Sequence, residues 1–165
     1  MKRFLVYLFL LLTVITISGC GQKRAEPVPK TDKEKYEYYK KQADRGDSTG
    51  IMMLGLFYES GIYVTKDEAK AVEYYKKSSE QGNINAMFLL GRCYHWSRGT
   101  KYDIEKAVYW YKKSAEGGHL IAMEFLSELY WQGKEIKADK KEYEKWRRKI
   151  EETENKLREK NKKRG

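Results

Sequence analysis

The chain has 165 residues, of which 41% are hydrophobic, 35% are charged and 14% are aromatic. This composition excludes a wholly disordered chain, which is poor in aromatic residues, and a multispan membrane protein, which carries far less charge. It indicates one soluble domain with a modest core. The formal net charge is +10. Residues 137–165 supply +6 of it, because they contain 13 Lys and Arg against 7 Asp and Glu.

Residues 1–19 have the organisation of a signal peptide. Lys2 and Arg3 form a short positive region, and an apolar run of 14 residues follows from Phe4 to Ile17. That run is shorter than the roughly 20 residues that a membrane-spanning helix needs. An uncleaved anchor, or a cytosolic protein with an unusual start, is the alternative interpretation.

The stretch Ile17-Ser18-Gly19-Cys20 resembles the bacterial lipobox, in which an aliphatic residue and two small residues precede a cysteine. The resemblance implies cleavage before Cys20, whose thiol then receives a diacylglycerol, so we expect a membrane-anchored lipoprotein. Gly21 follows instead of aspartate. By resemblance to enterobacterial lipoproteins, this favours the outer membrane, facing the periplasm, if the cell is Gram-negative. We expect residues 20–31, polar and proline-containing, to be the lipidated cysteine and a flexible tether.

From residue 31 onward the chain repeats itself every 36 residues. The segments AVEYYKKSSEQG (71–82) and AVYWYKKSAEGG (107–118) are nearly the same. A fixed period of this length indicates a solenoid built from stacked supersecondary units. Aligned at this spacing, small residues, leucines, tyrosines and aspartates recur: Gly50/Ala86/Ala122, Leu54/Leu90/Leu126, Gly55/Gly91/Ser127, Tyr58/Tyr94/Tyr130, Asp67/Asp103/Asp139, Ala71/Ala107/Tyr143 and Tyr74/Trp110/Trp146.

Each repeat is predicted to be a helix A, a loop, a helix B and a glycine stop. The recurring aspartates lie where helix B begins and can accept its free N–H groups. Gly46, Gly82 and Gly118 lie where helix B ends, where glycine readily adopts the left-handed conformation. The predicted helices are a lone helix B at 32–45, then the pairs 48–60 with 67–81, 84–97 with 103–117, and 120–132 with 139–154 or beyond.

The predicted fold class is therefore all-α, an α/α solenoid of about three and a half 36-residue helix-turn-helix repeats. We assign the solenoid to residues 32–154 and a basic charged tail to residues 155–165. The stretches AMFLLGRCY (86–94) and DIEKAVYWYKKSAEGG (103–118) resemble Sel-one-like repeats, relatives of the tetratricopeptide repeats. The resemblance covers about 120 residues and implies an α/α superhelix that binds other proteins. Ser127, Tyr143 and Glu154 depart from the family's small residues in the third repeat.

Catalytic chemistry has little support in the sequence. His95 and His119 are the only histidines, and Cys93 and His95, two residues apart on a helix, do not face each other. Cys93 shares its column with Phe57 and Leu129, so we interpret it as a small buried hydrophobic residue rather than a reactive thiol. Some cysteine-rich Sel-one-like proteins have been associated with β-lactam binding, but this sequence lacks their paired cysteines. It also lacks the Ser-x-x-Lys motif that serine acyl transfer in that chemistry needs. We expect no enzyme activity, no cofactor and no bound metal.

Candidate binding residues lie on helix A, away from the recurring packing columns. Their identities vary from repeat to repeat, which indicates freedom from packing, and Trp and Arg are preferred interface anchors. The candidate protein-binding residues are Phe88, Arg92, His95, Trp96, Glu128 and Trp131. Alternatively, Phe88 and Trp131 pack between repeats. The basic excess is open to three interpretations: a solvated helical end, contact with anionic lipid headgroups, or contact with an acidic protein.

The function that these features favour is a membrane-anchored protein–protein interaction module, an adaptor or scaffold of the cell envelope. The partner is another protein, with membrane contact through Cys20 and no nucleic acid. The alternative is an immunity protein that binds and neutralises a secreted antibacterial effector such as a phospholipase, because some lipoproteins with Sel-one-like repeats have that role.

Overall fold

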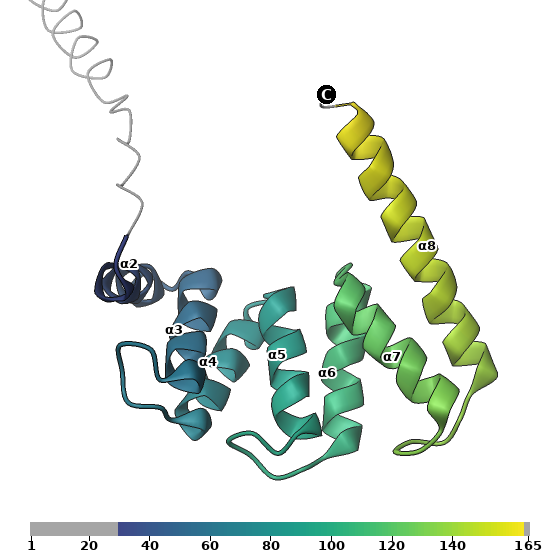
Figure 1. Cartoon of the computed structure of the whole chain (residues 1–165), viewed down its shortest axis with the longest axis horizontal. Helices are drawn as coiled ribbons and strands as arrows, with labels where there is room; N and C mark the ends of the chain where they lie inside the picture. Colours follow the sequence, from purple (N-terminus) through teal and green to yellow (C-terminus); the bar gives the residue numbers. More distant parts are fainter. Residues whose placement is uncertain (1–29, 164–165) are drawn as a thin grey trace, which may run out of the picture.

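The computed structural model describes residues 30–163, which form seven α-helices in a curved row (Figure 1). The predicted signal peptide, Cys20 and nearly all of the predicted tether lie outside the described residues. The helices are α2 (Asp32–Asp44), α3 (Ser48–Ser60), α4 (Glu68–Glu80), α5 (Ile84–His95), α6 (Ile104–Glu116), α7 (Leu120–Gln132) and α8 (Lys140–Lys162).

The repeat organisation predicted from the sequence is confirmed. Helices α3, α5 and α7 are the A helices, and each packs against the B helix that follows it, α4, α6 or α8. The lone B helix α2 packs against α3, and each B helix also contacts the next A helix. Neighbouring elements are therefore in contact in chain order, as in a solenoid, where each repeat contacts only its neighbours.

The helix starts are set by side-chain caps. Asp67 and Asp103 each accept a hydrogen bond from the backbone N–H three residues later, at 2.9 Å. Asp139 accepts from the N–H groups of Lys141 and Glu142. Asp139 and Glu142 have the spacing of a reciprocal capping box, but the Glu142 carboxylate instead accepts hydrogen bonds from Lys145 and Trp146.

The helix B stops behave as predicted. Gly46, Gly82 and Gly118 have φ of +83°, +84° and +94°, in the region that glycine adopts without the steric penalty of a Cβ atom. The amide of the residue after each glycine returns to a carbonyl of the last helical turn, as Asp47 N–H does to Gln42 O at 3.1 Å. The chain therefore reverses into the next A helix within a few residues.

Close approach of the two helices in a repeat requires a glycine on helix A. A Cβ atom on Gly55 would lie 2.5 Å from Cε1 of Tyr75, and one on Gly91 would lie 2.6 Å from Cδ1 of Tyr111. Both tyrosines have no exposed surface. The glycine column thus makes room for a buried tyrosine ring.

Each of the first two full repeats is also closed by a serine hydroxyl. Ser78 Oγ donates to the Ser48 carbonyl, and Ser114 Oγ donates to the Ile84 carbonyl, both at 2.7 Å and both 30 residues apart. These bonds join the end of helix B to the start of helix A. In the third repeat, Ile150 stands in the serine column and is only 6% exposed, so an apolar contact replaces the hydrogen bond there.

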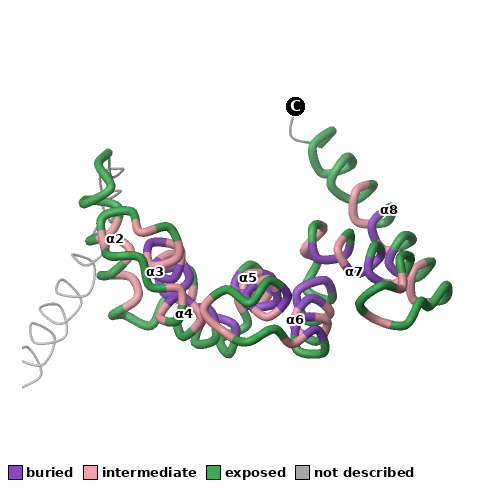
Figure 2. Tube along the Cα trace, turned by 60° about the horizontal axis from the view of Figure 1, so that its bottom comes forward, coloured by how far each residue is buried: buried purple, intermediate pink, exposed green. Residues whose placement is uncertain are grey.

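The third repeat ends the stack differently from the others. Helix α8 has 23 residues, whereas the other helices have 12 or 13. Trp146 is fully buried against the stack, but residues 155–163 are exposed (Figure 2). None of the helices between residues 30 and 163 is both long and apolar enough to cross a membrane.

Candidate protein-binding surface

The structure divides the six candidate binding residues into two groups. Phe88 and His95 are buried, at 8% and 9% exposure. Arg92 is half-buried, and the exposed members are Trp96, Glu128 and Trp131. Of the six candidates, only the half-buried Arg92 and the exposed Trp96, Glu128 and Trp131 are therefore accessible at the surface.

Phe88 packs between repeats, which was the alternative interpretation for this residue. Its ring lies 4.8 Å from the imidazole of His119 and 5.4 Å from the ring of Phe125, measured between centroids. Both of those residues belong to the following repeat. The burial of Phe88 thus helps to fix the angle between α5 and α7.

His95 holds three elements together. Its Nδ1 atom lies 3.2 Å from the Tyr111 hydroxyl, and its Nε2 atom lies 2.7 Å from Oε2 of Glu135, in the loop between α7 and α8. One tautomer satisfies both contacts: the Tyr111 O–H donates to Nδ1, and Nε2–H donates to the carboxylate. Sequence reasoning missed Glu135, because it lies in a loop, 40 residues from His95.

Trp96 is the most firmly held exposed aromatic residue of this surface. Its ring stacks on the His95 imidazole at 5.1 Å and meets the edge of Phe125 at 5.7 Å. The guanidinium carbons of Arg92 and Arg98 lie 5.2 Å and 5.6 Å from the ring centroid, within cation–π distance. The ring is nevertheless 41% exposed. Contacts within the chain therefore hold the Trp96 ring in place while part of it stays exposed.

Trp131 occupies the corresponding region of the next A helix and is 64% exposed. One side of its ring contacts Tyr143 of α8, with 5.1 Å between centroids. Glu128 lies one turn earlier on α7 and accepts a hydrogen bond from Gln132. The A-helix surface thus carries arginines beside Trp96 and a carboxylate close to Trp131.

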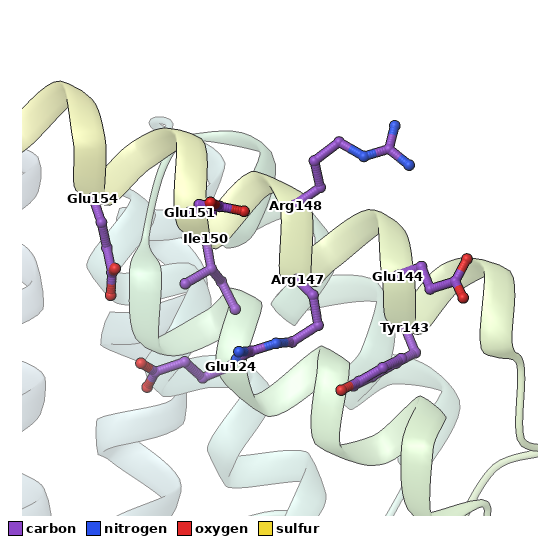
Figure 3. A pocket seen from close by; sticks show the side chains of 8 residues that line it. All are labelled: Glu124, Tyr143, Glu144, Arg147, Arg148, Ile150, Glu151 and Glu154. Carbon is purple, nitrogen blue, oxygen red and sulfur yellow. The ribbon is translucent and has the colours of Figure 1, made fainter.

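A groove between α7 and α8 was not predicted from the sequence. Glu124 of α7 lines one side of this groove of about 600 Å³, and α8 lines the other. Figure 3 shows Arg147, Ile150 and Glu154 pointing from α8 toward α7. Glu124 stands in the column of Phe88, and Arg147 stands in that of Tyr111. Charged residues therefore replace the aromatic pair that fills this space in the preceding repeat. These two replacements are the feature of the sequence from which the groove could have been predicted.

Cys93 and the histidines do not assemble a reactive site. Cys93 is 3% exposed, and burial raises the pKa of its thiol to about 12. His119 caps α7, since its Nδ1 accepts the Ala122 N–H at 3.2 Å. Among residues 30–163, no three His, Cys, Asp or Glu side chains are grouped so that they could hold a metal ion.

The helix pairs, the glycine–tyrosine contacts and the exposed A-helix surface define an α/α-solenoid repeat protein. The Sel1 repeat family model matches residues 48–83, 84–119 and 120–142, which together exceed half of the chain. The chain therefore belongs to the Sel1 repeat family, whose members are protein–protein interaction modules built on a typically non-catalytic scaffold. The third match ends at residue 142, in the first turn of α8, so most of this longer helix lies outside the family model.

Several solved structures resemble the chain. A Sel1 repeat protein from Oxalobacter formigenes is 36% identical with a TM-score of 0.70, and the match covers 73% of this chain and 49% of that one. The protective antigen c5321 of uropathogenic Escherichia coli, which displays an SLR fold, is 29% identical with a TM-score of 0.67, over 72% and 26% of the two chains.

Helicobacter pylori cysteine rich protein B is 28% identical with a TM-score of 0.56, over 59% of this chain and 73% of that one. The chain thus spans about half the length of the Oxalobacter protein and about a quarter of the Escherichia coli antigen. Comparison with curated proteins gives no match.

Proposed function

We propose that the chain is a membrane-anchored adaptor that binds another protein through the A-helix surface around Trp96 and Trp131. The observation that carries the proposal is the state of Trp96, which is rigidly held and yet 41% exposed. An aromatic side chain that is already ordered loses little conformational entropy on binding, which is a property of interface anchors. Membership of a protein-binding repeat family supports the same assignment.

The charges around the two tryptophans favour a partner with a particular pattern. Arg92 and Arg98 lie over the Trp96 ring, and Arg98 also pairs with Glu59 at 3.2 Å. Glu124 and Glu128 are exposed on α7. A partner segment with an acidic residue near α5 and a basic residue near α7 would complement this surface. The anchor is the predicted lipid on Cys20, with the outer membrane as the proposed location.

Site-specific crosslinking in the full chain tests this proposal. A photo-crosslinking amino acid placed at Ser60, an exposed residue at the A-helix end beside the Trp96 region, should capture the partner in living cells. Replacing Trp96 with alanine should weaken that complex by ~2 kcal/mol or more. Tyr109→Ala is the matched control, because Tyr109 is 52% exposed but lies on α6.

Equal losses of crosslinking in the Trp96→Ala and Tyr109→Ala variants would contradict a binding surface on the A helices. Retention of both variants in the membrane fraction is needed for the comparison. Cys20→Ala, tested separately, should leave the protein unprocessed at the predicted site and without lipid. An unmodified Cys20 in the mature natural protein, seen by mass spectrometry, would remove the anchor from the proposal without affecting the binding surface.

A further inference from the structure

The positive charge of the described chain is concentrated at one end of α8. Residues 30–139 contain 18 Lys and Arg against 17 Asp and Glu, a net charge of +1. Residues 140–154, the first part of α8, contain 6 against 5, again +1. Residues 155–163 contain 5 against 1, a net charge of +4. We call this last segment the basic tip, and its basic residues are Lys156, Arg158, Lys160, Lys162 and Lys163.

The charges of the basic tip are exposed and mostly unpaired. Arg158 lies 3.5 Å from Glu154, but the four lysines form no ion pair with a carboxylate in the part of the chain that the structure describes. A solenoid needs a polar surface at its end to stay soluble, and the mixed charges of residues 140–154 already meet that need. An excess of one sign favours a partner of opposite charge.

The basic tip projects toward the side of the row from which the chain enters α2. Helix α8 is about 35 Å long at 1.5 Å per residue, and its C-terminal part extends beyond the other helices on that side (Figure 1). The loops that join the two helices of each repeat lie on the opposite side. Lys30 follows the predicted lipidation site, Cys20, by ten residues, which span at most about 35 Å. A membrane that carries Cys20 is therefore held close to Lys30, and on this side of the row it would meet the basic tip.

We propose that the basic tip of α8 binds anionic phospholipid headgroups, such as those of phosphatidylglycerol, in the membrane that anchors the chain. The proposal rests on the lipid anchor of the proposed function, because the anchor keeps the tip near the headgroups. An anionic membrane surface attracts Lys and Arg over about a Debye length. Leu157 is the only apolar residue of the tip, so the contact is electrostatic and needs no insertion. Attached at both ends, the row of helices lies along the membrane and does not hang from the tether alone.

A fluorescent probe in the full lipidated protein tests this contact. Asn161→Cys places an environment-sensitive dye on the tip without changing its charge, and the buried Cys93 stays unlabelled in the folded protein. The protein is reconstituted in vesicles of phosphatidylcholine, with or without phosphatidylglycerol, that carry a quencher on the headgroup of a trace lipid. Quenching should be several-fold stronger with phosphatidylglycerol and should be lost at high salt. A dye at Thr65→Cys, exposed in the loop between α3 and α4, is the control and should not respond.

Charge removal identifies the residues responsible. Changing Lys156, Lys160 and Lys163 together to Gln should abolish the effect of phosphatidylglycerol. The matched variant changes three exposed loop lysines to Gln and should leave the effect intact: Lys101, Lys134 and Lys137. Unchanged helical circular dichroism establishes that both variants fold.

Flotation of the protein with the vesicles separates the two levels of the proposal. A protein that floats with neither kind of vesicle refutes the anchor, on which the tip contact depends. Flotation with both kinds but equal quenching at residue 161 overturns the tip contact alone, and it is the result expected if the tip binds an acidic protein instead. Equal effects of the two triple variants would also overturn it.

Discussion

His95 stands one repeat after Glu59, and both residues contact the hydroxyl of the tyrosine that lies 16 residues later. Tyr75 O–H donates to Glu59 at 2.5 Å, and Tyr111 O–H lies 3.2 Å from His95 Nδ1. Each also reaches the following repeat, Glu59 through Arg98 and His95 through Glu135. The two connections differ in where the carboxylate lies. Glu59 supplies it from the earlier repeat of its pair, whereas Glu135 supplies it from the later one.

The first prediction concerns that connection. Glu135→Ala removes the acceptor for the His95 Nε2–H, which is 2.7 Å from the carboxylate, and should lower the free energy of unfolding by about 1 kcal/mol. Urea denaturation followed by circular dichroism measures it. Lys134→Ala, at the exposed neighbouring position, serves as the control and should stay within about 0.5 kcal/mol of the natural protein.

The second prediction concerns the glycine column. Alanine in a helix is favoured over glycine by about 1 kcal/mol, but a Cβ atom on Gly91 would meet the Tyr111 ring at 2.6 Å. Gly91→Ala should therefore destabilise the protein, and Gly91→Leu should lower the free energy of unfolding by about 1–3 kcal/mol or more through overpacking. Thermal melting is the measurement. Ser127 already carries a Cβ atom in this column, so Ser127→Ala should have the smaller effect; unchanged melting of Gly91→Leu would refute close packing.

The third prediction is a pH dependence of stability that arises at His119. Burial lowers the pKa of this imidazole below its ordinary value near 6.5, and only the neutral form can accept the Ala122 N–H. Because the pKa is lower in the folded state, the stability from this group is complete above pH 6.5. It is lost as the pH falls from there through the folded-state pKa.

His119→Asn isolates this effect, because Asn83 caps α5 at the same position of the preceding repeat. The variant should be somewhat less stable at pH 8, because it loses the stacking of His119 on Phe88, but its melting temperature should fall less than that of the natural protein between pH 8 and pH 5. The same comparison cancels the contributions of all other titratable groups, which the two proteins share. Identical loss of stability in the two proteins between pH 8 and pH 5 would exclude His119 as the source.

The fourth prediction concerns the reactivity of Cys93. With its pKa raised to about 12 by burial, the thiol is not ionised at neutral pH, and the thiolate is the reactive form. A maleimide should label Cys93 rapidly in denaturant. In the native protein, labelling should be no faster than unfolding. A cysteine introduced at the exposed position 152 should react at once. Rapid labelling of native Cys93 would contradict its assignment as a packing residue.

The framework of the fold was predictable because each framework residue recurs at the same spacing. Asp67, Gly82 and Gly91 have counterparts 36 residues away, so local caps and close packing could be inferred without coordinates. Trp96 was identified as an anchor candidate by residue type and column. Its contact with Phe125 depends on the angle between repeats, which no periodic pattern encodes.

The contact between His95 and Glu135 escaped prediction for a related reason. Glu135 lies in a loop, where its direction is set by the turn rather than by helical periodicity. The groove between α7 and α8 left a readable signal, since Glu124 and Arg147 replace Phe88 and Tyr111 in their columns. That signal indicated a change in the last repeat but not that the space would remain open.

Helix α2 has no fully buried residue, although it is the element that joins the stack to the chain's N-terminal residues. If residues 1–29 are held at a membrane and a bound partner pulls on the stack, this helix is the one that yields first. Its 13 residues span about 20 Å as a helix and about 43 Å when extended. Under such a load, unfolding α2 alone would lengthen the link by about two nanometres and would let the repeats follow a moving partner while their cores remain intact.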